Sequence, residues 1–449
     1  MSVPLHRREF LQTSAAGLTA TIATTQLLAD EAAPAATKSA NDKIVVAVMG
    51  VNGRGSALAQ AFQSQPNVEI GYICDVDERA IAKVAKPIAD RQGREAKGIK
   101  DFRQALDDKS IDVLVCAAPN HWHAPATILG CSAGKHVYVE KPCSHNAREG
   151  ELAVAAARKN NCVVQMGSQR RSRPGIVEGI QRLHKGDLGR VLYARTWYNN
   201  RRPEIGRGKE TSVPSWLDWS LWQGPAPEKP YLDNIVHYNW HWRWHWGNGE
   251  LGNNGIHALD VARWGLGVEY PTTIVSTGAR ARYSDDQETP DTHVATYTFA
   301  GKEGEPTKTI SWEGLSWSPY GPEGSGFGVS FHAEQGTMMI EEDGYKIFDE
   351  KNKVAEEIKG KGGDGHHFAN FLDCIRTGKR PNADIEEGHK STLLCHLGNI
   401  AWKLAQHGES VVVDPQAKAK DDPHRISPIY PKAEPMWGRE YRKGWEPVV

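Results

Sequence analysis

The chain has 449 residues, of which 39% are hydrophobic and 24% are charged, and its formal net charge is −1. Such a length exceeds one ordinary hydrophobic core and predicts two domains with tails, while the near-zero charge excludes a nucleic-acid partner, which needs a basic face. The seven cysteines are odd in number and include no CxxC pair, so the sequence predicts neither a disulfide framework nor a metal site.

Residues 1–40 have the composition of an export segment. Arg7 and Arg8 are followed by Phe10 and Leu11, then by a weakly apolar stretch rich in Ala and Thr. That stretch is too short and too polar to cross a bilayer, which takes about 20 apolar residues, so no membrane span is expected. The pattern resembles a twin-arginine signal, which implies that the protein is exported to the periplasm already folded, often with a cofactor inside.

A strand, a tight turn and a helix are predicted in "DKIVVAVMGVNGRGSALAQAF". Gly50 ends the apolar run, and Arg54 follows between Gly53 and Gly55. Such a turn lets backbone N–H groups approach a pyrophosphate, which the helix N-terminus then stabilises. Asn52 occupies the second glycine position of the usual GxGxxG pattern, and Asn tolerates positive φ better than most residues. Taken alone, this cluster is weak evidence for a dinucleotide site.

A carboxylate follows the next apolar run, "VEIGYICDVDERA", in which Asp75 lies 25 residues after Gly50. At the end of a second strand it can accept hydrogen bonds from the adenosine ribose, and it would repel a 2′-phosphate. NAD is therefore favoured over NADP, although Arg54 and Arg79 keep NADP open. The alternative is that Asp75 is a solvated loop residue.

Two more buried strands are predicted in "IDVLVCAAPNHWHAPATILGCSAGKHVYVEKP". The first is followed by a loop with Pro119, Asn120 and His123, and the second ends in Glu140 and Lys141. Parallel strands with ligands at their carboxyl ends are typical of a doubly wound sheet.

The motifs "APNHWH" and "VYVEKP", in this order and at this separation, resemble the Gfo/Idh/MocA family, named for glucose–fructose oxidoreductase and inositol dehydrogenase. The resemblance runs from about residue 43 to about residue 406. It implies an NAD(P)-dependent oxidoreductase acting on CH–OH groups, with Lys141 beside the nicotinamide and the reacting hydroxyl. Hydride leaves a carbinol carbon only as the hydroxyl proton is removed, so a proton-accepting group is needed there. The alternative is a surface lysine after an edge strand.

The predicted fold class is α/β, with an amino-terminal Rossmann domain built on a doubly wound parallel sheet. A carboxyl-terminal α+β domain with a large open, mostly antiparallel sheet follows. The boundaries are expected at residues 41–163 and 164–408, after a signal peptide and linker at 1–40 and before an extended tail at 409–449. The predicted cofactor-binding residues are Gly50, Asn52, Gly53, Arg54, Gly55, Asp75, Pro119, Asn120, His123, Glu140 and Lys141.

Strands and helices of the second domain are predicted from four stretches. "DTHVATYTF" and "GKEGEPTKTISWEG" have the pattern of neighbouring antiparallel strands, and the segment from Pro203 to Pro230 has that of loops. "GDGHHFANFLDCIRTGKRP" and "EGHKSTLLCHLGNIAWKLAQHG" predict amphipathic helices. The tail is expected to wrap the protein or to contact a partner.

In the resembling family an Asp stands four residues before a histidine of the active site, and here the pair is Asn253 and His257. An amide can orient the imidazole by a hydrogen bond, but it cannot stabilise an imidazolium as a carboxylate does. Either Lys141 carries more of the proton transfer, or the chemistry differs from simple alcohol oxidation. Asp260 and Glu250 are alternative carboxylates.

Four tryptophans alternate in "YNWHWRWHWGNGELGNNGIHALD", and period two predicts an extended segment that presents the rings to one side. They could pack in the core, or one or two could form a floor for a sugar ring. We expect Trp242 and Trp244, together with His257 and Arg170, to contact the substrate, although Arg170 could equally be exposed beside Arg171.

The leading hypothesis is an exported NAD(P)-dependent oxidoreductase that acts on a sugar, sugar derivative or cyclitol. Outside the cytoplasm a released dinucleotide would not be recycled, so a tightly bound cofactor is expected. The resemblance also implies an alternative, glycoside hydrolysis or elimination through transient oxidation at C3. A non-catalytic secreted binding protein is the third reading. Because family members commonly pair through the open sheet, a homo-oligomer, either a dimer or a tetramer, is expected.

Overall fold

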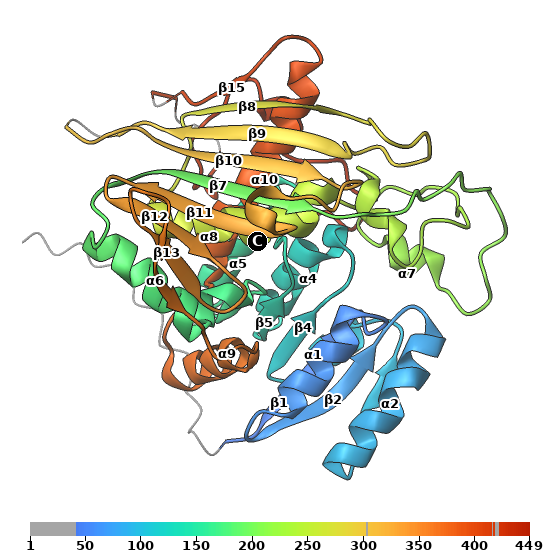
Figure 1. The fold of residues 1–449 in the computed structure, drawn as a ribbon. Helices are drawn as coiled ribbons and strands as arrows, with labels where there is room; N and C mark the ends of the chain where they lie inside the picture. Colours follow the sequence, from blue (N-terminus) through green and yellow to red (C-terminus); the bar gives the residue numbers. More distant parts are fainter. Residues whose placement is uncertain (1–41, 302–303, 415, 418–421) are drawn as a thin grey trace, which may run out of the picture. The chain divides into compact units, whose positions relative to one another are not determined.

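The computed structural model describes residues 42–301, 304–414, 416–417 and 422–449 (Figure 1). The predicted signal segment at residues 1–40 lies outside the described residues, so export stays a prediction. Within the described ranges, no helix is both long enough and apolar enough to cross a bilayer.

Apolar runs in the first third of the chain form a parallel six-stranded sheet in the order β3-β2-β1-β4-β5-β6. Its strands are β1 (Ile44–Met49), β2 (Val68–Cys74), β3 (Lys97–Ile99), β4 (Val113–Cys116), β5 (His136–Val139) and β6 (Val164–Met166). The order reverses between β1 and β4, and doubly wound sheets bind ligands outside the carboxyl ends of the strands at such a point. The predicted Rossmann sheet is confirmed.

Helices cover this sheet, which explains why its strands are apolar without alternation. They are α1 (Arg54–Gln63), α2 (Glu78–Gln92), α3 (Arg103–Leu106), α4 (Asn120–Ser132) and α5 (Ala147–Lys159). A sixth helix, α9 (Gly365–Thr377), comes from the far end of the chain and lies beside α1 (Figure 1). Phe368 of α9 packs against Phe62 with 5.0 Å between ring centroids, and Phe371 packs against Tyr138 at 5.9 Å.

The predicted boundary at residue 163 is too early, because β6 completes the first sheet by pairing with β5. A three-residue strand has too little periodicity to be recognised from sequence. The assignment of α9 to the second domain also needs correction, since its apolar face is buried against the first sheet. A single boundary in the sequence therefore does not separate the two lobes, because α9, late in the chain, belongs to the core of the first sheet.

The second sheet has nine strands in the order β14-β13-β12-β11-β7-β10-β9-β8-β15. They are β7 (Val191–Asn199), β8 (Thr273–Ala279), β9 (Thr292–Phe299), β10 (Lys308–Leu315), β11 (Phe327–Ala333), β12 (Gly336–Ile340), β13 (Tyr345–Phe348), β14 (Val354–Ile358) and β15 (Val411–Val412). Strands β7 and β10 pair in parallel, and the other neighbouring strands are antiparallel. The predicted pairing of β9 with β10 is confirmed, as is the mostly antiparallel sheet.

Helices α8 and α10 pack on this second sheet. The helices of the lobe are α6 (Pro174–Lys185), α7 (Trp219–Gln223), α8 (Ile256–Leu266) and α10 (Ile385–Ala405). Shorter helical segments are η1 (Gln169–Ser172), η2 (Asn239–Trp242), the π-helical η3 (Leu251–Gly255), η4 (Pro322–Gly324) and η5 (Glu434–Met436). A Cβ on Gly265 of α8 would lie 2.3 Å from the Phe331 ring, so glycine allows the helix its close approach. The predicted helices at α9 and α10 are confirmed.

The prediction of an extended tryptophan segment is wrong. Residues 239–242 form a 3₁₀ helix, followed by turns, and the four rings contact different partners. Trp246 packs edge-on against Trp219 and Trp222, which stack on each other with 4.7 Å between ring centroids. The local alternation was overridden because tryptophans far apart in sequence form a separate small core around it.

The tail was expected either to wrap the protein or to contact a partner, and in the structure it packs along both lobes. Strand β15 adds to the edge of the second sheet, and Arg425 then forms an ion pair with buried Glu151 of α5 at 3.2 Å. Further along, the Tyr441 hydroxyl donates to Glu149 at 2.9 Å, and Arg439 donates to the carbonyl of His245 at 3.0 Å. The tail thus ties the first lobe to the tryptophan-rich segment of the second.

Candidate active site

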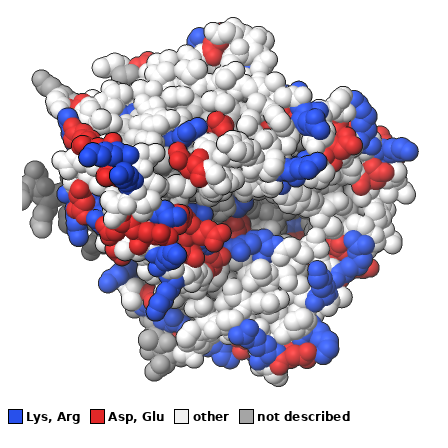
Figure 2. Space-filling model, viewed as in Figure 1, with Lys and Arg blue, Asp and Glu red and all other residues white. Residues whose placement is uncertain are grey.

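A cavity of about 660 Å³ lies at the carboxyl ends of the first sheet. Figure 2 shows a hollow in the surface with basic and acidic side chains close to its edge. The cavity is lined from the first lobe by Met49, Gly50, Asn52, Gly53, Arg54, Cys74, Asp75, Val76, Lys100, Asp101, Phe102, Ala117, Ala118, Pro119, Asn120, Trp122, His123, Glu140 and Lys141. From later in the chain it is lined by Gln169, Arg173, Leu221, Trp222, His237, Tyr238, Trp240, His241, Asn253, His257 and Asp364.

The turn after β1 requires glycine at two positions. Gly50 has φ +83°, and a Cβ there would lie 2.6 Å from the backbone nitrogen of Ala118 on the neighbouring strand end. A Cβ on Gly55 would lie 2.1 Å from the carbonyl oxygen of Gly50, so α1 starts in direct contact with the turn. Gly53 has open space and lines the cavity. Such a cradle fits a pyrophosphate, because backbone approaches it without intervening side chains.

Asp75 braces this turn and also faces the cavity. Its carboxylate accepts the backbone N–H of Val51 at 2.7 Å and that of Asp77 at 2.9 Å. Burial raises the pKa of Asp75, and these two hydrogen bonds oppose the rise. Each carboxylate oxygen keeps a second lone pair for a ligand hydroxyl. The alternative of a solvated loop residue is therefore wrong, since Asp75 is 8% exposed.

The start of α4 connects the two lobes. Asn120 donates from its amide to the Asn248 side chain at 2.9 Å. Both ring nitrogens of His123 lie against carbonyl oxygens, that of Pro142 at 2.5 Å and that of Ala118 at 2.7 Å. His123 therefore holds the segment after β5 close to the segment after β4.

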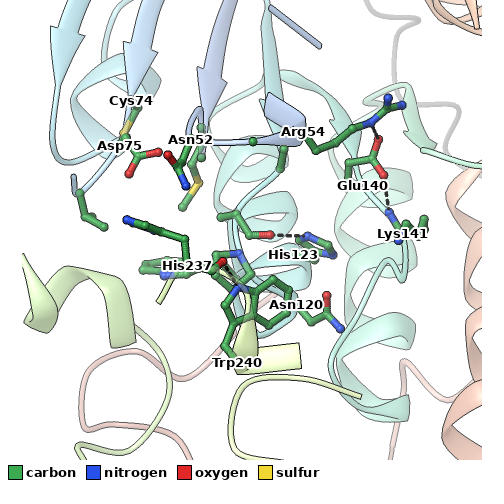
Figure 3. A pocket seen from close by; sticks show the side chains of 18 of the residues that line it. Asn52, Arg54, Cys74, Asp75, Asn120, His123, Glu140, Lys141, His237 and Trp240 are labelled. Carbon is green, nitrogen blue, oxygen red and sulfur yellow. Dashed lines mark hydrogen bonds and ion pairs between the residues drawn. The ribbon is translucent and has the colours of Figure 1, made fainter. Parts of the chain in front are cut away.

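Glu140 is the centre of a charged network (Figure 3). It accepts the Arg54 Nε–H at 2.9 Å and the Gln169 amide at 3.3 Å. Arg54 also approaches Asp364, before α9, at 3.5 Å, and Arg173 pairs with the same carboxylate at 3.0 Å. The network fixes the glycine turn, the end of β5 and the start of α9 relative to one another.

Lys141 follows directly and reaches across to the second lobe. Its Nζ donates to the backbone oxygen of Asn253 at 2.8 Å and to the side-chain oxygen of that residue at 3.3 Å. Burial lowers the pKa of Lys141, the charge of Glu140 opposes this, and the charge of Arg54 lowers the pKa further. No carboxylate of the described chain forms an ion pair with this ammonium group. Lys141 is thus a half-buried amine whose pKa is lowered, which makes its neutral form more accessible.

His257 lines the same end of the cavity. Burial and the charge of Lys141 hold the pKa of its imidazole well below the usual range, so the ring is neutral. Its ring forms no hydrogen bond within the described ranges, and the Asn253 amide oxygen, which could have oriented it, faces Lys141 instead. Asn253 lies on the π-helical turn η3 that precedes α8.

The two alternative carboxylates also have other partners. Asp260 pairs with Arg171 at 2.9 Å and accepts the Ser391 hydroxyl at 2.6 Å. Glu250 pairs with Arg202 at 2.5 Å. Neither lines the cavity, so neither replaces the missing Asp beside His257.

Three predicted substrate residues lie outside the cavity lining, which corrects the prediction for this group. The Trp242 ring is buried beneath the Arg202 guanidinium at 4.8 Å, and the Trp244 ring lies below the Lys403 ammonium at 4.2 Å. Arg170 donates to the carbonyl of Glu341 and lies over the Phe327 ring. Their positions depend on packing partners that the sequence pattern did not identify.

Other aromatic side chains take the predicted place beside the cavity. Trp240 lines it, and the His241 ring stacks on Trp240 with 3.6 Å between centroids. His237 and Tyr238 line it as well. The tryptophan-rich stretch correctly indicated aromatic residues beside the cavity. Its interpretation as a strand, however, selected Trp242 and Trp244 instead of Trp240. No group of His, Cys, Asp or Glu in the described part of the chain is arranged to hold a metal ion.

Two family models match the chain. Residues 44–168 match an oxidoreductase family described as an NAD-binding Rossmann fold, and residues 195–300 match the C-terminal alpha/beta domain of the same oxidoreductase family. The matches cover the sheet, turn and strand ends that border the cavity.

Similar curated proteins include two dehydrogenases and a glycosidase. The chain is 28% identical over 257 residues to a glycosyl hydrolase family 109 protein of Saccharopolyspora erythraea, covering 52% of this chain and 56% of that protein. It is 29% identical over 147 residues to inositol 2-dehydrogenase of Salmonella typhimurium (32% and 43% covered). With levoglucosan dehydrogenase of Pseudarthrobacter phenanthrenivorans it shares 28% over 224 residues (49% and 49%). The chain thus spans about half the length of these relatives.

Solved structures of similar fold cover more of the chain. The WlbA dehydrogenase of Bordetella pertussis, in complex with NADH and UDP-GlcNAcA, has a TM-score of 0.62 at 19% identity and covers 83% of this chain and 99% of its own. Levoglucosan dehydrogenase, in complex with NADH and levoglucosan, has a TM-score of 0.62 at 16% identity, with the same coverage. At such low sequence identities the similarity shows a shared fold and nothing more specific.

Proposed function

This chain belongs to the Gfo/Idh/MocA oxidoreductase family, and from that premise we propose that it transfers a hydride between a sugar, sugar-derivative or cyclitol hydroxyl and NAD. The observation that carries the proposal is the position of Lys141. A half-buried amine that forms no ion pair with a described carboxylate lines a cavity that also contains a glycine cradle.

The residues that would hold NAD extend along the cavity. The turn from Gly50 to Arg54 fits the pyrophosphate, and Asp75 fits the adenosine ribose. NAD, when bound, supplies the hydride acceptor or donor. Of the two arginines that kept NADP open in the sequence, Arg54 pairs with Glu140, and Arg79 pairs with Asp77 and does not line the cavity. This favours NAD.

The proton at the reacting hydroxyl is assigned to Lys141. Its lowered pKa allows a neutral amine to accept that proton during oxidation, and the ammonium form returns it during reduction. The backbone oxygen of Asn253 holds the amine in place through the 2.8 Å hydrogen bond. His257, neutral and without a bound partner, can donate or accept a hydrogen bond at the substrate. Trp240 and Tyr238 supply apolar surface on which a sugar ring can lie.

Glycoside cleavage with no net redox change is the second candidate. Similarity to a glycosyl hydrolase family 109 protein favours it, as does the amide at Asn253 where a carboxylate was expected. Cofactor-loaded protein would be mixed with sugars, cyclitols and aryl glycosides. Oxidation predicts stoichiometric absorbance from reduced nicotinamide, whereas redox-neutral cleavage predicts aglycone release without it. If no compound gives reduced nicotinamide or released aglycone, the result favours a non-catalytic binding protein.

We also propose that the protein is exported through the twin-arginine pathway with NAD already bound and that it retains the cofactor. Arg7 and Arg8 support the export proposal. Fractionation of cells that express the chain tests it, and substitution of both arginines by lysine should keep the protein in the cytoplasm. Mass spectrometry of the denatured protein should find dinucleotide at one per chain.

A homo-oligomer formed through the open face of the nine-stranded sheet is part of the same proposal. Val275 of β8 and Val294 of β9 are 56% and 40% exposed, and their register places both on one face. Light scattering at micromolar concentration should report a dimer or tetramer. Val275→Glu, which places a charge on that face, should shift the mass toward the monomer.

A further inference from the structure

A contact between the two lobes lies at the edge of the cavity, which one of its residues, His237, lines. The Asp77 carboxylate binds the His237 ring at 2.9 Å and pairs with Arg79 at 2.8 Å. The Arg79 guanidinium lies 3.3 Å above the Trp216 ring, which in turn faces His237 with 5.8 Å between centroids. We call these four residues the latch. Asp77 and Arg79 come from the first lobe, and Trp216 and His237 come from the second.

Backbone hydrogen bonds reinforce the latch. The N–H of Asp218 donates to the carbonyl of Val76 at 2.9 Å, and the N–H of Glu78 donates to the carbonyl of Trp216 at 3.3 Å. The segment around Leu217 therefore runs antiparallel to the turn after β2. That turn begins with Asp75 and Val76, which line the cavity.

The segment that the latch holds continues into the cavity wall. Its lining residues are Leu221, Trp222, His237, Tyr238, Trp240 and His241. Figure 3 shows Asp75 from the first lobe together with His237 and Trp240 from the second-lobe segment, all bordering the same space. A ligand in the cavity would therefore be covered by these lining residues. The latch holds them to the first lobe at the end of the cavity where Asp75 lies. In a Rossmann sheet, the carboxylate after the second strand marks the adenosine-ribose end of the dinucleotide.

We propose that the latch retains the bound dinucleotide, so that NAD leaves only when the contact between Trp216 and Arg79 opens. The inference rests on the proposed function, because it takes NAD as the ligand of the cavity. Asp77, Arg79 and Trp216 do not line the cavity, so they act as positioning residues. Product release or lid opening limits many enzymes, and here that step sets cofactor exchange.

The latch also gives Arg79 a role other than binding a 2′-phosphate. Its guanidinium donates to both carboxylate oxygens of Asp77, at 3.0 Å and 2.8 Å, while one face covers Trp216. An arginine with these two partners links the two lobes of the chain rather than binding a phosphate. Its removal should therefore affect NAD and NADP alike.

The test is the dissociation rate of NADH from Trp216→Ala and Arg79→Ala, measured by fluorescence after mixing with excess NAD. Both variants should release NADH on the order of tenfold faster than the unmodified protein, the change that corresponds to loss of one cation–π contact, with unfolding temperatures little changed. Arg282→Ala is the matched control. That guanidinium lies 5.6 Å from the Tyr283 ring, in an exposed loop away from the cavity, and its removal should leave the rate unchanged.

The outcomes separate the latch from the function. Absence of NADH binding by the unmodified protein would overturn the proposed function. Binding with unchanged release in Arg79→Ala would overturn the latch alone, and so would an effect of this variant confined to NADP. If Trp216→Ala does not fold, Arg79→Ala decides the question, because that side chain is 55% exposed and its removal opens no core.

Discussion

The two walls of the cavity are built differently. The first-lobe wall consists of the ends of five parallel strands, β1 to β5, where backbone pairing fixes Gly50, Asp75 and Lys141. The second-lobe wall is the tryptophan-rich segment, which has little regular structure. It is held by side chains from distant places, including Asn120 through Asn248. In the proposed function, the first wall holds the cofactor and the proton-accepting amine, and the second wall contacts the substrate and retains the cofactor.

The largest effect is expected from Lys141→Ala on the first wall. Loss of the proton-transferring amine should reduce turnover by a factor on the order of 10²–10⁴, with NAD still bound, since Lys141 acts on the hydroxyl rather than the pyrophosphate. Steady-state kinetics and cofactor stoichiometry check this. Lys86→Ala on α2, whose side chain is 81% exposed, is the control and should be silent.

Gly50→Ala should weaken NAD binding by more than about tenfold, corresponding to roughly 1.4 kcal/mol, because its Cβ meets the Ala118 backbone at 2.6 Å. Gly93→Ala provides a matched comparison. Gly93 also has positive φ, +69°, but a Cβ there meets nothing within 4 Å, so only the conformational strain remains. Calorimetric titration with NAD compares the two. Equal losses in both variants would show that the close strand contact is unimportant.

Protonation of buried histidines should weaken the fold in acid. Burial lowers the pKa of His293 to about 4, below its value of about 6.5 in the unfolded chain. Between these two pH values the unfolded state binds more protons than the folded state. The free energy of unfolding therefore decreases as the pH is lowered, by roughly 1.4 kcal/mol per pH unit for this group. In urea unfolding from pH 7 to 4.5, His293→Gln should therefore lose less stability than the unmodified protein. Parallel pH profiles would contradict this.

The smallest effect is expected from Trp445→Ala in the tail, where it packs behind the first wall. The Trp445 ring packs edge-on against Trp122 of the cavity lining, with 5.3 Å between centroids, and Arg103 lies over it. Such aromatic contacts are worth about 1 kcal/mol. The substrate KM should rise a few-fold while kcat stays constant. A fall in kcat with constant KM would place the tail in the chemistry rather than in wall packing.

The sequence predicted the first wall well because its signals are local. Buried parallel strands have continuous apolar runs, and a glycine turn next to such a run has few alternative structures. Gly50, Asp75, Glu140 and Lys141 all line the cavity where the strand pattern placed them.

The second wall escaped prediction because its structure depends on distant contacts. Trp242 and Trp246 alternate locally as a strand would, but they pack against rings and charges from elsewhere in the chain. The π-helical turn at Asn253 likewise changes the register to His257 by an amount that residue spacing does not reveal. The Asn253 amide oxygen accepts a hydrogen bond from Lys141 rather than from the imidazole.

The pairing of a reactive amine with a bound nicotinamide is tested most directly by one absorbance measurement. NAD-loaded protein and its Lys141→Ala variant, with equal cofactor content by mass spectrometry, would be mixed with the same panel of sugars and cyclitols. Formation of reduced nicotinamide in the unmodified protein and its loss in the variant is the predicted result. Equal formation in both would show that Lys141 has no part in the reaction.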